Sequence, residues 1–167
     1  YDEFVHASLH QGMKLSGAEL VAFRHNDMAH LRGSLQQKPG FIVTESLFSM
    51  EGDIAPLKEL AEIARNSGLA LIVDEAHANG LFGEHGAGLC EEAGVEADCF
   101  ARIYTFGKAL GSYGAVVIGP AALRQYLVNF CKPFIYSTAQ DTAVLLRVKH
   151  AYKFIQDNNN EVNKLYK

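Results

Sequence analysis

Two segments of the sequence place a reactive side chain directly after an apolar run. Asp74 follows residues 69–73, and Lys108 lies just beyond residues 102–106. A carboxylate at the end of a buried strand is costly without a cationic partner. A lysine flanked by small residues in a sheltered crevice can lose its proton and act as a nucleophile. Taken alone, each segment also has a structural interpretation: Asp74 caps the next turn, and Lys108 is a solvated residue of a glycine-rich turn.

The segment around Lys108 does not have the pattern of a phosphate-binding P-loop. Lys108 is followed by Ala109 rather than Ser or Thr, and no glycine stands at the required upstream spacing. An acid at one strand end and an amine at the next suit pyridoxal phosphate, because this cofactor needs a carboxylate facing its protonated ring nitrogen and an amine that tethers its aldehyde. We therefore predict that Asp74 and Lys108 face a common cavity wide enough for a flat pyridine ring.

Strand-length apolar runs alternate with helical patterns along the chain. The expected strands span residues 19–23, 41–48, 69–74, 102–106, 115–119 and 134–137. Helical spacing predicts helices over residues 56–68, 120–130 and 145–155. Because residues 69–73 are continuously apolar, we expect this strand to be covered on both faces. The sequence thus predicts an α/β fold with a mostly parallel sheet sandwiched by helices and with ligand groups at strand ends.

The composition argues against several classes of protein. The 167 residues predict one domain, and a net charge of −4 without a basic run makes nucleic acid an unexpected partner. No apolar run approaches the roughly 20 residues of a membrane span, so no membrane partner is expected, and the first residues lack a signal-peptide pattern. The cysteines are odd in number and widely spaced, which predicts reduced thiols in the cytoplasm and neither a disulfide framework nor a zinc site.

Several other residues that could carry chemistry are assigned structural roles. The histidines outside the motifs form no ligand constellation, so we expect no metal site and treat as structural His25, His30, His85 and His150. Cys90 and Cys99 are expected to be packing residues.

Four motifs along the chain, taken together, resemble those of one enzyme family. They are Asp74-Glu75-Ala76-His77, Thr105-Phe106-Gly107-Lys108, residues 45–53 and His6-Ala7-Ser8. In this order and approximate spacing they are similar to the α-oxoamine synthases, which are pyridoxal phosphate enzymes of fold type I, and the resemblance covers essentially the whole chain. It implies the large domain of the aminotransferase-like fold. It also implies decarboxylating condensation of an amino acid with an acyl-CoA.

Within this family, three segments point to one subfamily. Thr105-Phe106-Gly107-Lys108, residues 114–117 and residues 134–138 are most similar to the enzymes that join a pimeloyl thioester to L-alanine in biotin biosynthesis. A glycine C-acyltransferase, an aminotransferase on the same fold and a non-catalytic truncated paralogue are the alternatives.

The resemblance implies a catalytic role for three residues. Lys108 would hold the cofactor through a Schiff base and, once released, remove the α-proton of the amino acid. Asp74 would keep the ring nitrogen protonated. His6 would stack on the other face of the ring and help protonate or orient the acyl thioester; without the resemblance, His6 would be read as a surface residue.

Four further residues are implied to bind the cofactor. His77 and Ser49 would hydrogen-bond its phenolic oxygen, and Thr105 would bind its phosphate. Thr138 would reach the phosphate held by a neighbouring subunit, which implies a homodimer with a shared active site. Without the resemblance Ser49 would be read as a turn cap, and Glu45 either faces the substrate or braces the site.

The sequence departs from the family pattern in three respects. The family's glycine-rich segment before the stacking histidine is missing, as is the small C-terminal domain with its substrate-binding arginine. Residues 1–167 are therefore expected to be a partial large domain that binds cofactor weakly and is inactive alone. Gln140-Asp141 replaces a common proline pair, and Asn79 replaces a common threonine, which leaves the choice of substrate open.

Overall fold

The computed structural model describes residues 1–158 and is built around a four-stranded sheet. Its order is β1-β2-β3-β4, and the strands are β1 (Phe41–Glu45), β2 (Ala70–Asp74), β3 (Cys99–Thr105) and β4 (Ala115–Ile118). Strands β1, β2 and β3 are parallel, and β4 pairs antiparallel to β3. The predicted α/β class and the mostly parallel sheet are confirmed.

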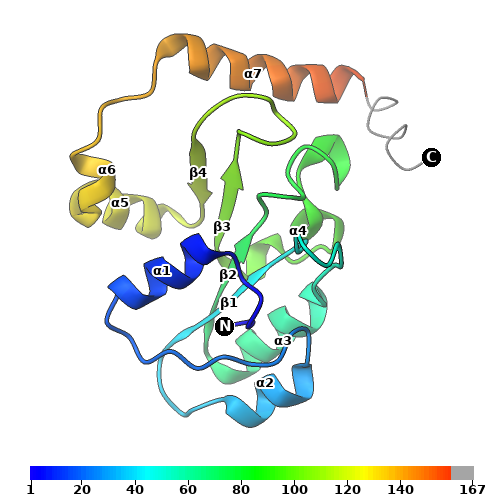
Figure 1. Cartoon of the computed structure of the whole chain (residues 1–167), viewed down its shortest axis with the longest axis vertical. Helices are drawn as coiled ribbons and strands as arrows, with labels where there is room; N and C mark the ends of the chain where they lie inside the picture. The colour runs from blue at the N-terminus through cyan, green and yellow to red at the C-terminus, as the bar shows by residue number, and fades with distance from the viewer. Residues whose placement is uncertain (159–167) are drawn as a thin grey trace.

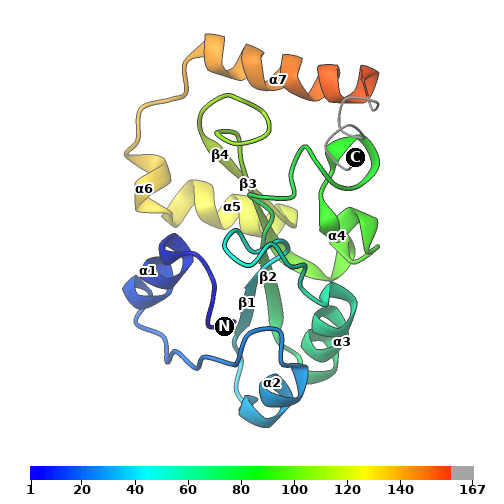
Figure 2. The ribbon, with the colours of Figure 1, turned by 45° about the vertical axis from the view of Figure 1, so that its right-hand side comes forward.

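Helices lie on both sides of this sheet (Figures 1 and 2). In both views α3 and α4 lie on one side of the sheet and α1 on the other, while α7 crosses the end where the parallel strands terminate. The helices are α1 (Ala7–Leu15), α2 (Met28–Ser34), α3 (Leu57–Ser67), α4 (Leu89–Glu92), α5 (Ala121–Phe130), α6 (Lys132–Ile135) and α7 (Thr142–Asp157). Two short 3₁₀ turns, η1 (Glu84–Gly86) and η2 (Glu96–Asp98), flank α4.

Helix α3 packs its apolar stripe on the sheet and forms the centre of the core. Pro56 precedes its first turn, and Gly68 ends it in the left-handed region with φ +68°, which a residue with a side chain adopts only with strain. Leu60 on α3 is fully buried, as are Leu71 and Val73 of β2. The helix predicted after Pro56 is confirmed, and it holds β2 so that Asp74 emerges from the core.

Two predicted strands do not form within residues 1–158. In residues 19–23 only Phe23 pairs, through an isolated parallel bridge to Asp2, because the opposing segment turns away after Glu3. Residues 132–135 form α6 instead of a strand. Pro133 stands in the first turn of α6, where its fixed φ suits a helix, and the Tyr136 N–H donates to the Lys132 carbonyl.

The first strand also ends earlier than predicted, at Glu45. The chain then folds back, so that the Phe48 N–H donates to the Asp53 carbonyl at 3.0 Å. Phe48 is buried in this turn rather than in a strand. The turn continues to Ala55, whose N–H donates to the Ser46 carbonyl.

The last third of the described chain is less buried than the first two. Helix α7 is anchored by a hydrogen bond from the Tyr152 hydroxyl to Asn79 Oδ1 at 3.0 Å and by the buried Ile155. Exposed apolar side chains in this part include Tyr126, Phe130, Phe134, Tyr136 and Leu145. The predicted helices over residues 120–130 and 145–155 are confirmed as α5 and α7.

Two of the cysteines lie in the core, as predicted. Cys90 and Cys99 are buried free thiols with their sulfur atoms 3.8 Å apart. Among the described helices, none combines the length and apolarity needed to cross a membrane.

Candidate active site

The carboxyl ends of the three parallel strands bring acidic and hydroxyl groups together at one end of the sheet. This end, where β1, β2 and β3 terminate, is called the edge of the sheet below. Glu45 at the end of β1 is the register partner of Asp74 at the end of β2. Thr105 ends β3, and Asn79, in the turn after β2, donates to its carbonyl at 3.2 Å. Side chains that are far apart in the sequence therefore meet where an open α/β sheet binds its ligands.

Lys108 and His77 face each other at this edge. The Nζ atom of Lys108 lies 2.5 Å from Nε2 of His77. Burial lowers the pKa of His77, and the charge of Lys108 lowers it further, against the opposing effect of Asp74. The lowered pKa favours a neutral imidazole, whose Nε2 can accept a hydrogen bond from the lysine.

Asp74 is almost fully buried, with 7% of its surface exposed. Its Oδ1 accepts the Ala76 N–H at 2.8 Å, so the structural role considered from the sequence is present. Burial raises the pKa of Asp74, while the Ala76 hydrogen bond and the charges of Lys108 and the two nearby histidines oppose this shift. Asp74 thus lies within electrostatic reach of Lys108, and the common cavity between the two groups stays a prediction.

His6 begins helix α1 beside this cluster. Its Nδ1 lies 2.8 Å from the Ser8 hydroxyl, and its backbone N–H donates to Glu45 Oε1 at 2.5 Å. Burial raises the pKa of Glu45, and the hydrogen bond from His6 opposes the shift. Of the two roles considered for Glu45, bracing is the one this contact supports, because the carboxylate holds the backbone of His6.

Two buried hydroxyl groups close to Lys108 in the sequence have no hydrogen-bond partner in the described part of the chain. They are Thr105 Oγ1 and Ser112 Oγ. A buried hydroxyl without a partner is unfavourable, which marks a position where a ligand can accept hydrogen bonds. Phosphate oxygens are such acceptors, so Thr105 fits its predicted role. Ser112 was not predicted; its place in Gly111-Ser112, close after the lysine, was the available signal.

The structure does not test the predicted cofactor roles of Ser49 and Thr138. Ser49 lies exposed in the turn after β1, and Thr138 is exposed between α6 and α7. Within residues 1–158, no hydrogen bond joins either of them to His77, Asp74 or Lys108. Their roles remain predictions.

Glu75, next to Asp74, is a carboxylate with a structural role, which the sequence did not predict. It is fully buried, and its two oxygens accept the Leu89 and Cys90 N–H groups, both at 2.8 Å, and the Ser46 hydroxyl at 3.3 Å. It thereby satisfies the first amides of α4. A Cβ on Gly88 would lie 2.3 Å from Glu75 Oε2, so glycine is required there.

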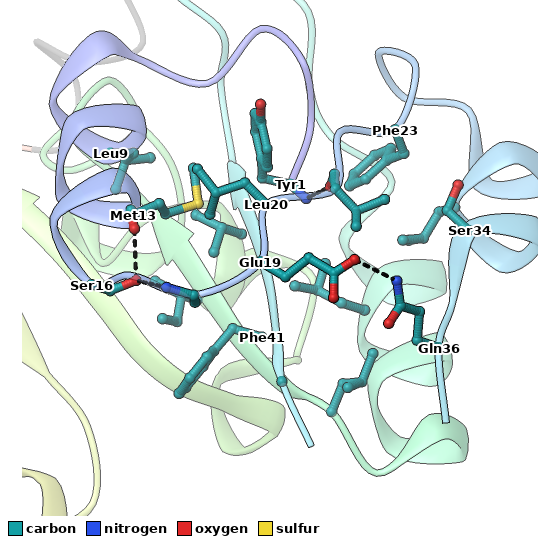
Figure 3. Close-up of a pocket in the computed structure, with 18 of the residues that line it drawn as sticks. Tyr1, Leu9, Met13, Ser16, Glu19, Leu20, Phe23, Ser34, Gln36 and Phe41 are labelled. Atoms are coloured by element: carbon teal, nitrogen blue, oxygen red, sulfur yellow. Dashed lines mark hydrogen bonds between the residues drawn. The ribbon is translucent and has the colours of Figure 1, made fainter. Parts of the chain in front are cut away.

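A large apolar cavity lies elsewhere, beside α1. It has a volume of about 650 Å³ and is lined mainly by apolar side chains from α1, the following loop and one face of the sheet. Figure 3 shows Leu9 and Met13 of α1 on one side and Phe41 of β1 below, with Glu19 and Gln36 hydrogen-bonded at 3.1 Å. No predicted site residue lines this cavity.

Comparisons with known proteins agree with the fold and the motifs. Residues 1–167 match the family described as aminotransferase class I and II. The 8-amino-7-oxononanoate synthase of Emericella nidulans is 39% identical over 96% of this chain and 43% of its own length. The chain therefore spans less than half of this relative.

Solved structures give the same picture. Serine palmitoyltransferase from S. paucimobilis, with a bound PLP-myriocin aldimine, superposes with a TM-score of 0.91 at 31% identity, over 99% of this chain and 42% of its own. An 8-amino-7-oxononanoate synthase from Francisella tularensis gives a TM-score of 0.88 at 34% identity, over 98% and 48% of the two chains. With a family match along its entire length, the chain belongs to the aminotransferase class I and II family.

Proposed function

We propose that the cluster at the carboxyl ends of β1, β2 and β3 binds pyridoxal phosphate and serves a decarboxylating condensation of an amino acid with an acyl-CoA. One observation carries this proposal: Lys108 contacts His77 and acts electrostatically on Asp74, and the hydroxyls of Thr105 and Ser112, which flank Lys108 in the sequence, lack partners among the described residues. The names of the similar enzymes support it as well.

Each residue of the cluster has a defined task in this proposal. The bound cofactor supplies an electron sink for the carbanion formed at the α-carbon of the substrate. Lys108 would tether the cofactor's aldehyde and, once the incoming amino acid has displaced it, its free amine would take up the α-proton, while His77 would accept a hydrogen bond from the lysine. Thr105 and Ser112 donate to the phosphate. These groups orient the reacting atoms and so remove part of the entropic barrier.

The pKa of Asp74 is expected to change when the cofactor binds. Burial holds the pKa of its carboxyl above the ordinary value. A pyridinium nitrogen facing it would supply a cationic partner and favour the carboxylate. We therefore expect binding to lower the pKa of Asp74, which infrared spectroscopy of the carboxyl group can follow.

The substrates we propose are L-alanine and a pimeloyl thioester, because the similar proteins include 8-amino-7-oxononanoate synthases. Condensation of serine with a longer acyl chain is the second candidate, supported by the serine palmitoyltransferase structure. Incubation with alanine, glycine or serine and a series of acyl-CoA thioesters, followed by mass spectrometry of the products, separates these possibilities.

We also propose a homodimer in which Thr138 contacts the cofactor phosphate of the partner. Light scattering with and without cofactor tests this proposal.

Cofactor binding is tested by titrating the chain with pyridoxal phosphate and recording the visible absorbance of the lysine-bound form. We expect a saturable band that disappears in Lys108→Ala. Lys58→Ala, which removes an exposed lysine of α3, is the matched control and should keep the band. An unchanged band in Lys108→Ala would contradict the proposal.

A further inference from the structure

His25 lies between two carboxylates from distant parts of the chain. Its Nδ1 is 3.0 Å from Asp2 Oδ1, and its Nε2 is 2.9 Å from Asp53 Oδ2. An imidazole has two ring nitrogens, and it can donate to two acceptors at once only when both carry protons. The geometry is therefore that of a charged histidine bridging two acids, which the sequence alone did not predict.

The surroundings hold this bridge in place. Asp2 is fully buried, and 16% of the His25 side chain is exposed. The ring stacks on Phe4 and lies nearly perpendicular to the ring of Phe48, with both ring centroids 4.5 Å away. These two contacts restrict rotation of the imidazole, so its two nitrogens stay aimed at the two carboxylates.

Asn26, the next residue, also hydrogen-bonds to both carboxylates. Its backbone N–H donates to Asp2 Oδ2 at 2.9 Å, and its Nδ2 donates to Asp53 Oδ2 at 2.7 Å. Asn26 has φ +51°, an uncommon conformation for a residue with a side chain. The two hydrogen bonds stabilise this conformation and keep His25 directed into the gap between the acids.

The two carboxylates belong to segments that carry proposed cofactor residues. Asp2 lies four residues before His6, and Asp53 lies four residues after Ser49. The first segment is also held to β1, because the Asp2 N–H donates to the Val43 carbonyl, and the loop after β1 is closed by the Phe48 N–H, which donates to the Asp53 carbonyl. A single histidine thus ties the segment of the stacking residue to the loop after β1.

We propose that His25 is a positioning residue, which fixes the segments of His6 and Ser49 relative to each other by bridging Asp2 and Asp53. This inference rests on the proposed function for its effect on cofactor binding. The bridge itself rests only on the contacts described.

The charge of His25 gives the bridge a pH dependence. Burial opposes its charged form, but the hydrogen bonds to Asp2 and Asp53 and their charges outweigh burial and raise its pKa. The other acid nearby is Glu3, which accepts the His25 backbone N–H at 2.9 Å. Because the pKa is raised on folding, the bridge stabilises the chain fully below the ordinary histidine pKa, and this contribution is lost as pH rises through the raised value.

A double-mutant cycle on cofactor binding separates positioning from general stabilisation. The variants are His25→Gln, Ser49→Ala and both together, with His150→Gln on α7 as the control for loss of an exposed histidine. We expect His25→Gln to weaken pyridoxal phosphate binding about tenfold, and by no more than about threefold when Ser49 is already replaced by alanine. His150→Gln should have no effect.

Amide hydrogen exchange tests the bridge independently of the cofactor. In His25→Gln we expect faster exchange at residues 46–54 and at the His6 amide, with no change in His150→Gln. If His25→Gln fails to fold, Asp53→Asn takes its place, because it keeps an oxygen acceptor but removes a charge. In Asp53→Asn the same faster exchange should begin at a lower pH than in the wild type.

Each result bears on one claim. If the wild-type chain binds no pyridoxal phosphate, the proposed function fails, while exchange still decides whether the bridge exists. Equal exchange in wild type, His25→Gln and Asp53→Asn would overturn the bridge. The same tenfold loss of affinity with Ser49 present and with Ser49 replaced by alanine would overturn the positioning role.

Discussion

Asp74 and Glu75 are adjacent carboxylates at the end of β2, and their surroundings are opposite. Glu75 points into the core and accepts three hydrogen bonds from Ser46, Leu89 and Cys90. Asp74 points to the edge of the sheet, where one described hydrogen bond, from Ala76, leaves most of its bonding capacity for other partners. The pleat of a strand, which directs successive side chains to opposite faces, accounts for the difference.

This difference in hydrogen bonding distinguishes residues that stabilise the fold from residues that can bind a ligand. Around Glu75 the buried polar groups are paired within the chain, whereas the hydroxyls of Thr105 and Ser112, like Asn26 Oδ1 and Asp53 Oδ1, lack partners within residues 1–158. Buried polar groups in proteins are normally satisfied. The proposed site therefore rests on the unpartnered hydroxyls and not on the cavity beside α1, which is apolar and contains none of these residues.

The largest effect on stability is expected at Glu75. Glu75→Ala leaves two backbone N–H groups and the Ser46 hydroxyl buried without acceptors, so we expect the free energy of unfolding to fall by about 3 kcal/mol or more. Urea denaturation followed by circular dichroism measures this. A loss below about 1 kcal/mol would remove the distinction drawn between the two carboxylates.

Gly88→Ala should also disturb the Glu75 carboxylate, in this case by steric overlap. Its Cβ would lie 2.3 Å from Glu75 Oε2, and Gly88 has φ +101°, where other residues are strained. We expect a loss of about 2–3 kcal/mol in the free energy of unfolding. Gly12→Ala is the matched control, because no atom lies within 4 Å of its added Cβ. In the middle of α1 this change should be neutral or stabilising; equal losses in both variants would argue against the contact.

Asp74→Asn should change stability by only about 1 kcal/mol or less near neutral pH, in contrast to Glu75→Ala. Asparagine still offers an oxygen to the Ala76 N–H. Because burial raises the pKa of Asp74, its ionisation costs the folded state stability as pH rises through that value. The variant should therefore gain on the wild type with increasing pH in denaturation curves. Cofactor affinity should fall sharply, and unchanged affinity would contradict the role of Asp74.

Much of this arrangement could be predicted from the sequence, because local patterns report it. The continuous apolar run before Asp74 marks a strand covered on both faces, and Pro56 with Gly68 marks the ends of α3. Asp74, His77 and Lys108 lie directly after strands, so the topology of a parallel sheet brings them together. His6 was predicted differently, from the resemblance of the His6-Ala7-Ser8 motif to the family.

Other features depend on tertiary contacts that no local pattern reports. Residues 19–23 have an apolar strand-like composition, but they pair through one bridge at Phe23 because the partner segment turns away. Residues 132–135 became a helix through the position of Pro133. The three-segment bridge of His25 and the acceptor role of Glu75 join residues at least 14 positions apart, so spacing in the sequence gave no sign of them.

The central claim is that Lys108 is the cofactor-bearing residue of this edge. The most direct measurement is to add pyridoxal phosphate at less than one equivalent, trap the lysine-bound form with borohydride, digest the chain and locate the label by mass spectrometry. We predict that the label lies on Lys108 and that Asp74→Asn reduces it. Label spread over exposed lysines such as Lys58, with none enriched at Lys108, would contradict the proposed site.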